Sequence, residues 1–331
     1  MLMKTKLASS KVLQAIDTAD LNFLRENLTH ASVNRPVWGG LPSLSYAVSR
    51  GNEMVVRELL SLGADVNLGR NGHTALLVAA GRANVPLIIL LLKAGAEPNQ
   101  GIQRTEGDLE RGFTPLMAAA SGGHTPAIDV LLKAGARCDA VTETGSTAVG
   151  FALLGGHRDV ANYLLDKGCR PGAWSLLKAI DNKDLTLVGK LLNSGADPNW
   201  RSTERWAWVM KGETPLGLAI RNNELTIIRK LLDHKADPNL ISVSRTPLDW
   251  ASYAGKTAIL ARLLRHGADP NLANEFGTTP LITAASEGQT EAIRVLLRAG
   301  ADKTLQLRSG ETARDFARAK HNEAVLKLLD A

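Results

Sequence analysis

Aromatic residues are scarce in this chain of 331 residues, of which Phe, Trp and Tyr together make up 4%. Sheet sandwiches and barrels draw heavily on aromatic and β-branched side chains, so this scarcity argues against an all-β fold. Alanine and leucine instead dominate the apolar fraction of 44%. Such a composition favours helices that pack closely through small side chains.

Long apolar runs are also missing. The longest, residues 85–92, falls well short of the roughly 20 residues that span a membrane, and Pro86 interrupts it. Residues 1–13 carry three lysines, but they hold neither an apolar run of signal-peptide length nor a small-residue cleavage site. We therefore expect a soluble, cytoplasmic protein with no membrane segment.

Residues that carry metal or catalytic chemistry are few and dispersed. Cys138 and Cys169 are the two cysteines, and no metal-ligand spacing surrounds them, so we expect small, buried, reduced side chains. The seven histidines do not converge, and the glycines lack the Lys-Ser or Lys-Thr ending of a phosphate loop. We expect no catalytic residue, no metal and no cofactor, and hence no enzyme.

The chain does contain two short motifs that recur together. The first reads Leu-Leu-x-x-Gly-Ala, and its copies lie within residues 59–67, 91–99, 131–139, 191–199, 231–239, 263–271 and 296–304. The second, Thr-Pro-Leu, stands about seventeen residues earlier and begins at Thr114, Thr214, Thr246 and Thr279, with weaker copies from Thr74, Thr147 and Thr312.

Both motifs have a physical meaning at the ends of helices. A threonine before proline starts a helix, because its oxygen caps free N–H groups and proline at the first helical position needs no donor. The glycine stops the next helix by adopting a left-handed conformation. Lys235 replaces that glycine in one copy and is expected to adopt the same conformation, at a cost of about 1 kcal/mol. A helix pair of this kind leaves one face bare, and only a stacked neighbour can cover it.

The two motifs resemble the ankyrin repeat, whose period is about 33 residues and whose signature is T-P-L-H-x-A. The resemblance covers about residues 8–331. It implies an all-α solenoid of about ten helix-turn-helix repeats with short β-hairpin fingers. It also implies a role in binding other proteins, through the fingers and through the inner helices that line a concave groove.

The register of the motifs predicts the domain organisation. Residues 1–36 are expected to form N-terminal capping helices, residues 37–304 the repeat array, and residues 305–331 a C-terminal capping repeat with a polar outer face. The repeat at 173–199 is about six residues short and lacks a finger. It forms either a notch that admits a partner or a bend between two sub-arrays.

Two fingers, residues 100–112 and 200–212, are about seven residues too long, and such insertions often lie on the binding side. The second holds three of the six tryptophans. The eleven Lys and Arg residues within 200–265 outnumber the six acids there, a local charge of +5 in a chain of +6. The tryptophans either contact a partner or pack the insertion onto its own scaffold.

Large aromatic and basic residues of the fingers and inner helices are the predicted partner-binding residues, because Trp and Arg dominate binding hot spots. They are Trp38, Arg70, Arg111, Phe113, Trp200, Arg205, Trp206, Trp208, Lys211, Arg221, Arg245, Trp250 and Tyr253. Further candidates on the same surface are Arg50, His73, Arg82 and Phe276.

These patterns favour a monomeric scaffold or adaptor that binds a protein with an acidic or mixed surface. A second hypothesis is an inhibitor or immunity-type protein that blocks a toxin or an enzyme. A third is a binder of nucleic acid or another anionic ligand through residues 200–265, although basic residues there alternate with acids. Salt distinguishes the third hypothesis, because counterion release makes nucleic-acid affinity fall steeply with ionic strength.

The tryptophans of the second insertion give a direct test. We expect Trp206→Ala combined with Trp208→Ala to weaken partner binding by more than about tenfold without unfolding the array. Titration calorimetry with the partner and a circular-dichroism melt would measure the two effects. An unchanged affinity would remove these residues from the hot spot.

Overall fold

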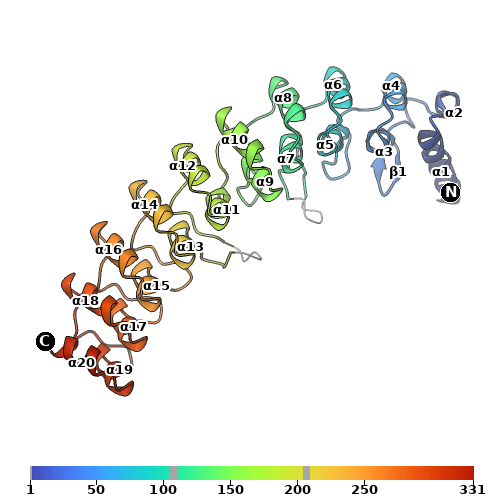
Figure 1. Ribbon diagram of the computed structural model, residues 1–331. Helices are drawn as coiled ribbons and strands as arrows, with labels where there is room; N and C mark the ends of the chain where they lie inside the picture. The colour runs from blue at the N-terminus through green and yellow to red at the C-terminus, as the bar shows by residue number, and fades with distance from the viewer. Residues whose placement is uncertain (1, 105–109, 204–208) are drawn as a thin grey trace. The chain divides into compact units, whose positions relative to one another are not determined.

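The computed structural model describes residues 2–104, 110–203 and 209–331, and it describes side chains from Ser9 onward, except that of Trp38. Twenty helices and one short sheet lie in the described part of the chain (Figure 1), so the predicted all-α solenoid is confirmed. None of those helices has the length and apolar character needed to cross a membrane. The chain divides into two compact units, Met1–Ser175 (unit 1) and Leu176–Ala331 (unit 2).

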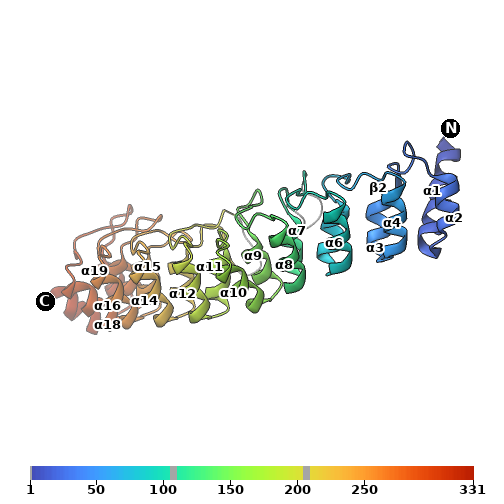
Figure 2. The same ribbon diagram turned by 90° about the horizontal axis from the view of Figure 1, so that it is seen from above.

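Unit 1 is built from helix pairs, each joined by a tight turn. Its helices are α1 (Leu2–Thr18), α2 (Leu21–Asn27), α3 (Ser43–Arg50), α4 (Glu53–Ser61), α5 (Ala75–Gly81), α6 (Val85–Lys93), α7 (Pro115–Ser121), α8 (Thr125–Lys133), α9 (Ala148–Leu154) and α10 (Arg158–Asp166). The odd-numbered helices α3 to α9 pack on one another in one row, and the even-numbered helices form a second row (Figure 2).

Unit 2 repeats the same arrangement. The helices from the boundary onward are α11 (Ser175–Asp181), α12 (Leu185–Asn193), α13 (Pro215–Arg221), α14 (Leu225–Asp233), α15 (Pro247–Tyr253), α16 (Thr257–Arg265), α17 (Pro280–Ser286), α18 (Thr290–Arg298), α19 (Ala313–Ala319) and α20 (Glu323–Asp330). Here α13, α15, α17 and α19 form the first row, and the even-numbered helices α12, α14, α16, α18 and α20 form the second.

The helix ends follow the two sequence motifs. Each threonine of the second motif caps the next helix, as Thr214 does by accepting a hydrogen bond from the backbone N–H of Gly217 at 3.0 Å. The turn residues adopt positive φ, and Lys235 does so at φ 66°, as predicted from its place in the register. Between these ends, the first leucine of each Leu-Leu pair is fully buried between neighbouring helix pairs. Burying such a side chain contributes about 2 kcal/mol.

The fingers are mostly turns and contain little β-structure. One antiparallel pair forms, between β1 (Pro36–Trp38) and β2 (Leu41–Pro42), and in the other described fingers pairing is limited to isolated bridges such as Ser242 with Arg245. Neighbouring fingers are joined by single backbone bonds, as from Glu143 N to Arg111 O at 3.0 Å. The described parts of these fingers therefore form no extended β-ladder, and backbone bonds link them to their neighbours.

Trp174 occupies the place of the missing finger in the short repeat. Its side chain is buried, and its Nε1 donates a hydrogen bond to Ser146 Oγ at 2.6 Å within unit 1. This tryptophan is therefore a core residue. The boundary between the two units follows at Ser175, while the choice between a notch and a bend stays a prediction.

The two cysteines correct one sequence-based expectation. Cys138 and Cys169 are joined by a disulfide, and their Cα atoms are 4.8 Å apart, within the usual range for such a bond. The expectation of two separate, reduced side chains was wrong. The residues lie in neighbouring repeats at nearly equivalent positions, so only the stacking of the repeats brings them together.

Within each unit, an asparagine ladder ties several repeats to the next along one edge. Its members occupy equivalent turns, and each donates its side-chain N–H₂ to the carbonyl of the next turn while its oxygen accepts the backbone N–H two residues further on. The members are Asn34, Asn67 and Asn99 in unit 1 and Asn199, Asn239 and Asn271 in unit 2. Asn239, for example, donates to Gly267 O at 3.2 Å and accepts from Asp269 N at 2.8 Å.

Removing one member of the ladder should cost stability. We expect Asn239→Ala to lower the free energy of unfolding by about 1–2 kcal/mol, because two hydrogen bonds between repeats are lost. Urea unfolding followed by circular dichroism would measure this loss. Asn182→Ala, an exposed asparagine outside the ladder, is the matched control and should change stability by less than about 0.5 kcal/mol. Equal effects of the two substitutions would contradict a special role for the ladder.

Candidate partner-binding surface

The predicted residues of unit 1 have different surroundings. Arg70 is exposed in its finger and donates a hydrogen bond to Gly39 O, and Arg111 is exposed at the end of the first long finger. Trp38 lies on β1, and its side chain is outside the described part of the structure. Phe113 is the exception, because it is not a surface residue.

Phe113 belongs to the core of unit 1. Its side chain is only 5% exposed, and its ring packs edge-on against Phe151 with ring centroids 4.8 Å apart. The ring supports the finger from beneath and is not available to a partner. Its assignment to the partner-binding surface was therefore wrong, because the position before Thr-Pro-Leu faces inward in this repeat.

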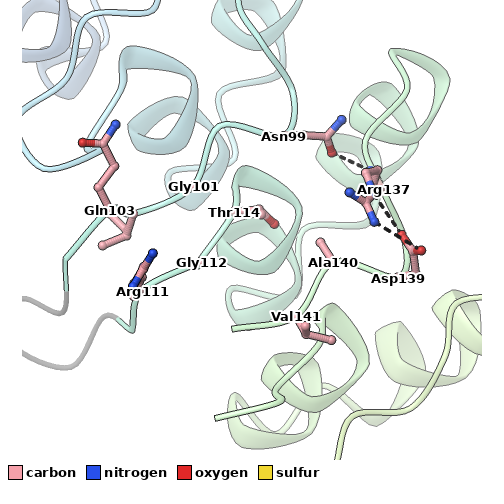
Figure 3. A pocket seen from close by; sticks show the side chains of 11 residues that line it. Asn99, Gly101, Gln103, Arg111, Gly112, Thr114, Arg137, Asp139, Ala140 and Val141 are labelled. Atoms are coloured by element: carbon pink, nitrogen blue, oxygen red, sulfur yellow. Dashed lines mark hydrogen bonds and ion pairs between the residues drawn. The ribbon is translucent and has the colours of Figure 1, made fainter. Parts of the chain in front are cut away.

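A hollow of about 470 Å³ lies beside Arg111 at the base of the first long finger (Figure 3). Its other lining residues come from this finger, from the next one and from the turn after α8: Asn99, Gly101, Ile102, Gln103, Gly112, Thr114, Arg137, Asp139, Ala140 and Val141. Arg137 Nε pairs with Asp139 Oδ1 at 3.2 Å, and this guanidinium holds the pKa of the carboxyl below its ordinary value. Arg111 and Val141 are exposed members of the same lining.

The second long finger is described at its two ends. Trp200 is half-buried at its start, and Lys211 is exposed near its end. Its base is closed by hydrogen bonds from Ser202 N to Glu213 O at 2.9 Å and from Gly212 N to Ser202 O at 2.8 Å. Arg205, Trp206 and Trp208 lie outside the described residues, so both predictions for these tryptophans stay open.

Three predicted residues come together on α15 and the finger before it. The guanidinium of Arg245 lies over two aromatic rings, with its central carbon 5.4 Å from the Trp250 ring centroid and 4.9 Å from that of Tyr253. Trp250 is fixed in turn by a hydrogen bond from its Nε1 to Ser242 O at 3.0 Å. Such contacts hold the arginine in one orientation.

A buried carboxylate fixes the same arginine from below. Asp249 is 0% exposed, and its Oδ2 pairs with Arg245 NH1 at 3.0 Å and accepts a hydrogen bond from Asn274 Nδ2 at 2.7 Å. Removing the arginine would leave this charge buried without its partner, which typically costs about 3–5 kcal/mol. Arg245 is therefore part of the scaffold as well as of the surface.

Phe276 completes what we call the aromatic–arginine cluster, which consists of Arg245, Trp250, Tyr253 and Phe276. Tyr253 and Phe276 are 45% and 67% exposed, and with Arg245 they border a hollow of about 230 Å³. The remaining lining residues are contributed by α17, α19 and the finger before each of them: Asn274, Thr278, Ile282, Thr283, Ser286, Glu287, Leu307 and Phe316. The result is a hollow of mixed polar and apolar lining with an ordered cation on its rim.

Arg221 is also held by a buried carboxylate in unit 2. Its NH2 lies 2.7 Å from Oε2 of Glu213, which is fully buried and also accepts a hydrogen bond from Ser242 Oγ at 3.1 Å. Burial raises the pKa of Glu213, and it outweighs the opposing effect of Arg221. Both arginines, Arg221 and Arg245, are thus paired with buried carboxyl groups of the protein itself.

Glu213, Asp249 and Asn274 were not predicted from the sequence. The available signal was an acid at the edge of, or inside, a segment that is otherwise apolar, since Glu213 directly precedes Thr-Pro-Leu and Asp249 directly follows it. Both acids are already among the six counted over residues 200–265, and each pairs with one of the arginines counted there. Over the described residues, no group of His, Cys, Asp and Glu is placed to hold a metal ion.

Comparison with known proteins agrees with this architecture. The family described as ankyrin repeats (3 copies) matches residues 13–102, 100–173, 176–274 and 251–331. A protein of Treponema pallidum (strain Nichols), described as a putative ankyrin repeat-containing protein, is 49% identical over 57 residues. That segment is 17% of this chain and covers 19% of the relative.

The buried glutamate should make stability depend on pH. Because its pKa is raised on folding above the ordinary value of about 4.3, the folded chain holds the Glu213 proton more tightly than the unfolded chain does. The stability from this proton is present below the ordinary pKa and is lost as pH rises through the raised one. Glu213→Gln removes this titration. As pH rises, we therefore expect the free energy of unfolding of the variant to increase relative to that of the wild type.

Urea unfolding of both proteins at several pH values between about 4 and 7 would measure this difference. Other carboxyls titrate equally in the two proteins and cancel. If the difference in unfolding free energy does not change with pH, or if the wild type gains stability relative to the variant as pH rises, Glu213 is not a buried acid with a raised pKa.

Proposed function

The chain belongs to the ankyrin-repeat family, and from this premise we propose that it is a non-catalytic protein-binding module, a monomeric scaffold or adaptor of the cytoplasm. The proposed docking site is the aromatic–arginine cluster of unit 2, together with the basic fingers beside it. Ankyrin repeats as a family are protein-interaction modules, and the matched segments include every helix of this unit from Leu185 onward.

The observation that carries this proposal is the ordered exposure of Tyr253 and Phe276. Exposed aromatic rings that border a hollow are typical of anchor sites in interfaces. Arg245 is oriented beside them by Asp249, Trp250 and Tyr253 before any partner arrives. Little side-chain freedom then has to be lost on binding, which favours affinity.

The surrounding charges indicate what kind of partner fits. The described fingers of unit 2 expose Arg201, Lys211 and Arg308, with Glu275 and Glu311 between them. A partner segment that inserts an apolar or aromatic side chain into the hollow and places carboxylates near the basic fingers would complement this surface. We therefore propose an acidic or mixed protein surface as the ligand.

Nucleic acid fits the described surface less well. Arg221 and Arg245, two of its basic residues, are paired with buried carboxylates at 2.7 and 3.0 Å. Phosphate binding depends on cations that release counterions, and these two arginines have little uncompensated charge to offer.

A variant pair tests the site. We expect Tyr253→Ala combined with Phe276→Ala to lower the affinity for the partner by at least about tenfold, because two anchor rings are truncated. The partner would first be isolated from the native source on the immobilised chain, and its affinity for purified variants would then be measured by calorimetry. Leu225→Ala, an exposed apolar residue on α14 of the same unit, is the matched control.

Two further measurements distinguish the alternative functions, a nucleic-acid binder and an inhibitor, from an adaptor. An affinity that falls steeply between low and high salt, with no change in the double variant, would favour a nucleic acid or another polyanion over a protein. A tight one-to-one complex that abolishes an enzymatic or toxic activity of the partner would identify an inhibitor and not an adaptor. Unchanged affinity in the double variant would exclude the proposed cluster.

A further inference from the structure

The asparagine ladder is interrupted at one junction inside unit 1. The register places Asp139 where Asn67 and Asn99 stand in the two preceding repeats. A carboxylate cannot donate a hydrogen bond to Gly168 O, as an asparagine there would. Asp139 instead pairs with Arg137 of its own turn. The repeat that contains α7 and α8 therefore lacks this tie to the repeat that contains α9 and α10.

The disulfide lies at that same junction. Cys169 stands between Gly168 and Arg170, whose carbonyl and N–H are the two backbone groups that the ladder would engage, and Cys138 directly precedes Asp139. At the position of Cys169 the other copies of the turn carry alanine: Ala64, Ala96, Ala136, Ala196, Ala236, Ala268 and Ala301. The cysteine thus occurs in the turn that faces the missing asparagine.

We propose that Cys138 and Cys169 form a redox-controlled covalent tie that replaces the asparagine ladder between these two repeats. When the pair is oxidised, the disulfide holds the two turns together. When it is reduced, the junction has neither the covalent bond nor the paired hydrogen bonds that the neighbouring junction at Asn99 retains. The two redox states should differ in the local stability of this junction and not in the fold.

Thiol–disulfide exchange with a small-molecule disulfide, such as oxidised glutathione, would form the tie. Cys138 is partly exposed and Cys169 is buried, so the Cys138 thiolate attacks first and releases one molecule of the small thiol. Cys169 loses its proton, attacks the mixed disulfide at the Cys138 sulfur and releases the second. One small disulfide is reduced to two thiols for each protein disulfide formed, and reversal needs a reductant of the same class.

The tie borders the hollow beside the first long finger. Arg137 and Asp139, which flank Cys138, both line that hollow (Figure 3). Loosening the junction would let the turn that carries them move relative to Gly168 and Arg170. The redox state of the pair thereby sets the rigidity of this part of the surface of unit 1.

Hydrogen exchange on the wild-type chain tests the proposal without any substitution. The protein would be equilibrated with oxidised glutathione or with dithiothreitol, and the formation of the bond would be checked by peptide mass under non-reducing conditions. We expect reduction to accelerate amide exchange in peptides covering 131–140 and 160–172 by at least about tenfold. Peptides covering 59–67 and 91–99 are the internal control and should change by less than about twofold.

Asp139→Asn gives the decisive variant. Restoring the asparagine should return much of the lost protection in the reduced protein, because its amide can bind Gly168 O and accept from Arg170 N. Asn99→Asp is the matched control, and it should weaken the preceding junction to the same extent with and without dithiothreitol. Cysteines that stay reduced in oxidised glutathione, an exchange pattern that ignores the redox state, or an Asp139→Asn variant with no added protection when reduced would each overturn the proposal.

Discussion

Every helix pair in this chain has one apolar face that it cannot bury alone, and the contact between successive repeats is the constraint on which the rest depends. The fully buried leucines of the Leu-Leu pairs meet this need within each unit. Since burial is non-directional, a second device has to fix how one repeat sits on the next. The asparagine ladder supplies that direction, with two hydrogen bonds at each junction where a ladder asparagine stands.

The cluster on α15 shows how this scaffold becomes a surface. Asp249 and Ser242 are buried polar residues that fix Arg245 and Trp250 from beneath, and Tyr253 and Phe276 are then presented beside them. Two arginines that the sequence offers as partner-binding residues, Arg221 and Arg245, are paired with buried carboxylates of the protein itself. The exposed aromatic rings, and not the count of basic residues, are what make this region distinctive.

The repeat pattern was sufficient to predict the helix pairs, the threonine caps and the unusual turn at Lys235, because these depend on residues close together in the chain. It was not sufficient for side chains that meet across a junction. The inward position of Phe113, the pairing of Arg221 with Glu213, and the bond between Cys138 and Cys169 all depend on how neighbouring repeats are stacked. The sequence motif of a single repeat does not predict contacts between side chains of neighbouring repeats.

The asparagines of the ladder are also open to chemical degradation. Asparagine is among the residues most prone to spontaneous damage, and hydrolysis of its side-chain amide yields aspartate. The product at Asn67 or Asn271 would be the residue that already stands at position 139, with an acceptor in place of a donor. Ageing of the protein would therefore weaken the junctions between repeats one at a time, while the junction closed by Cys138 and Cys169 has no ladder asparagine to lose.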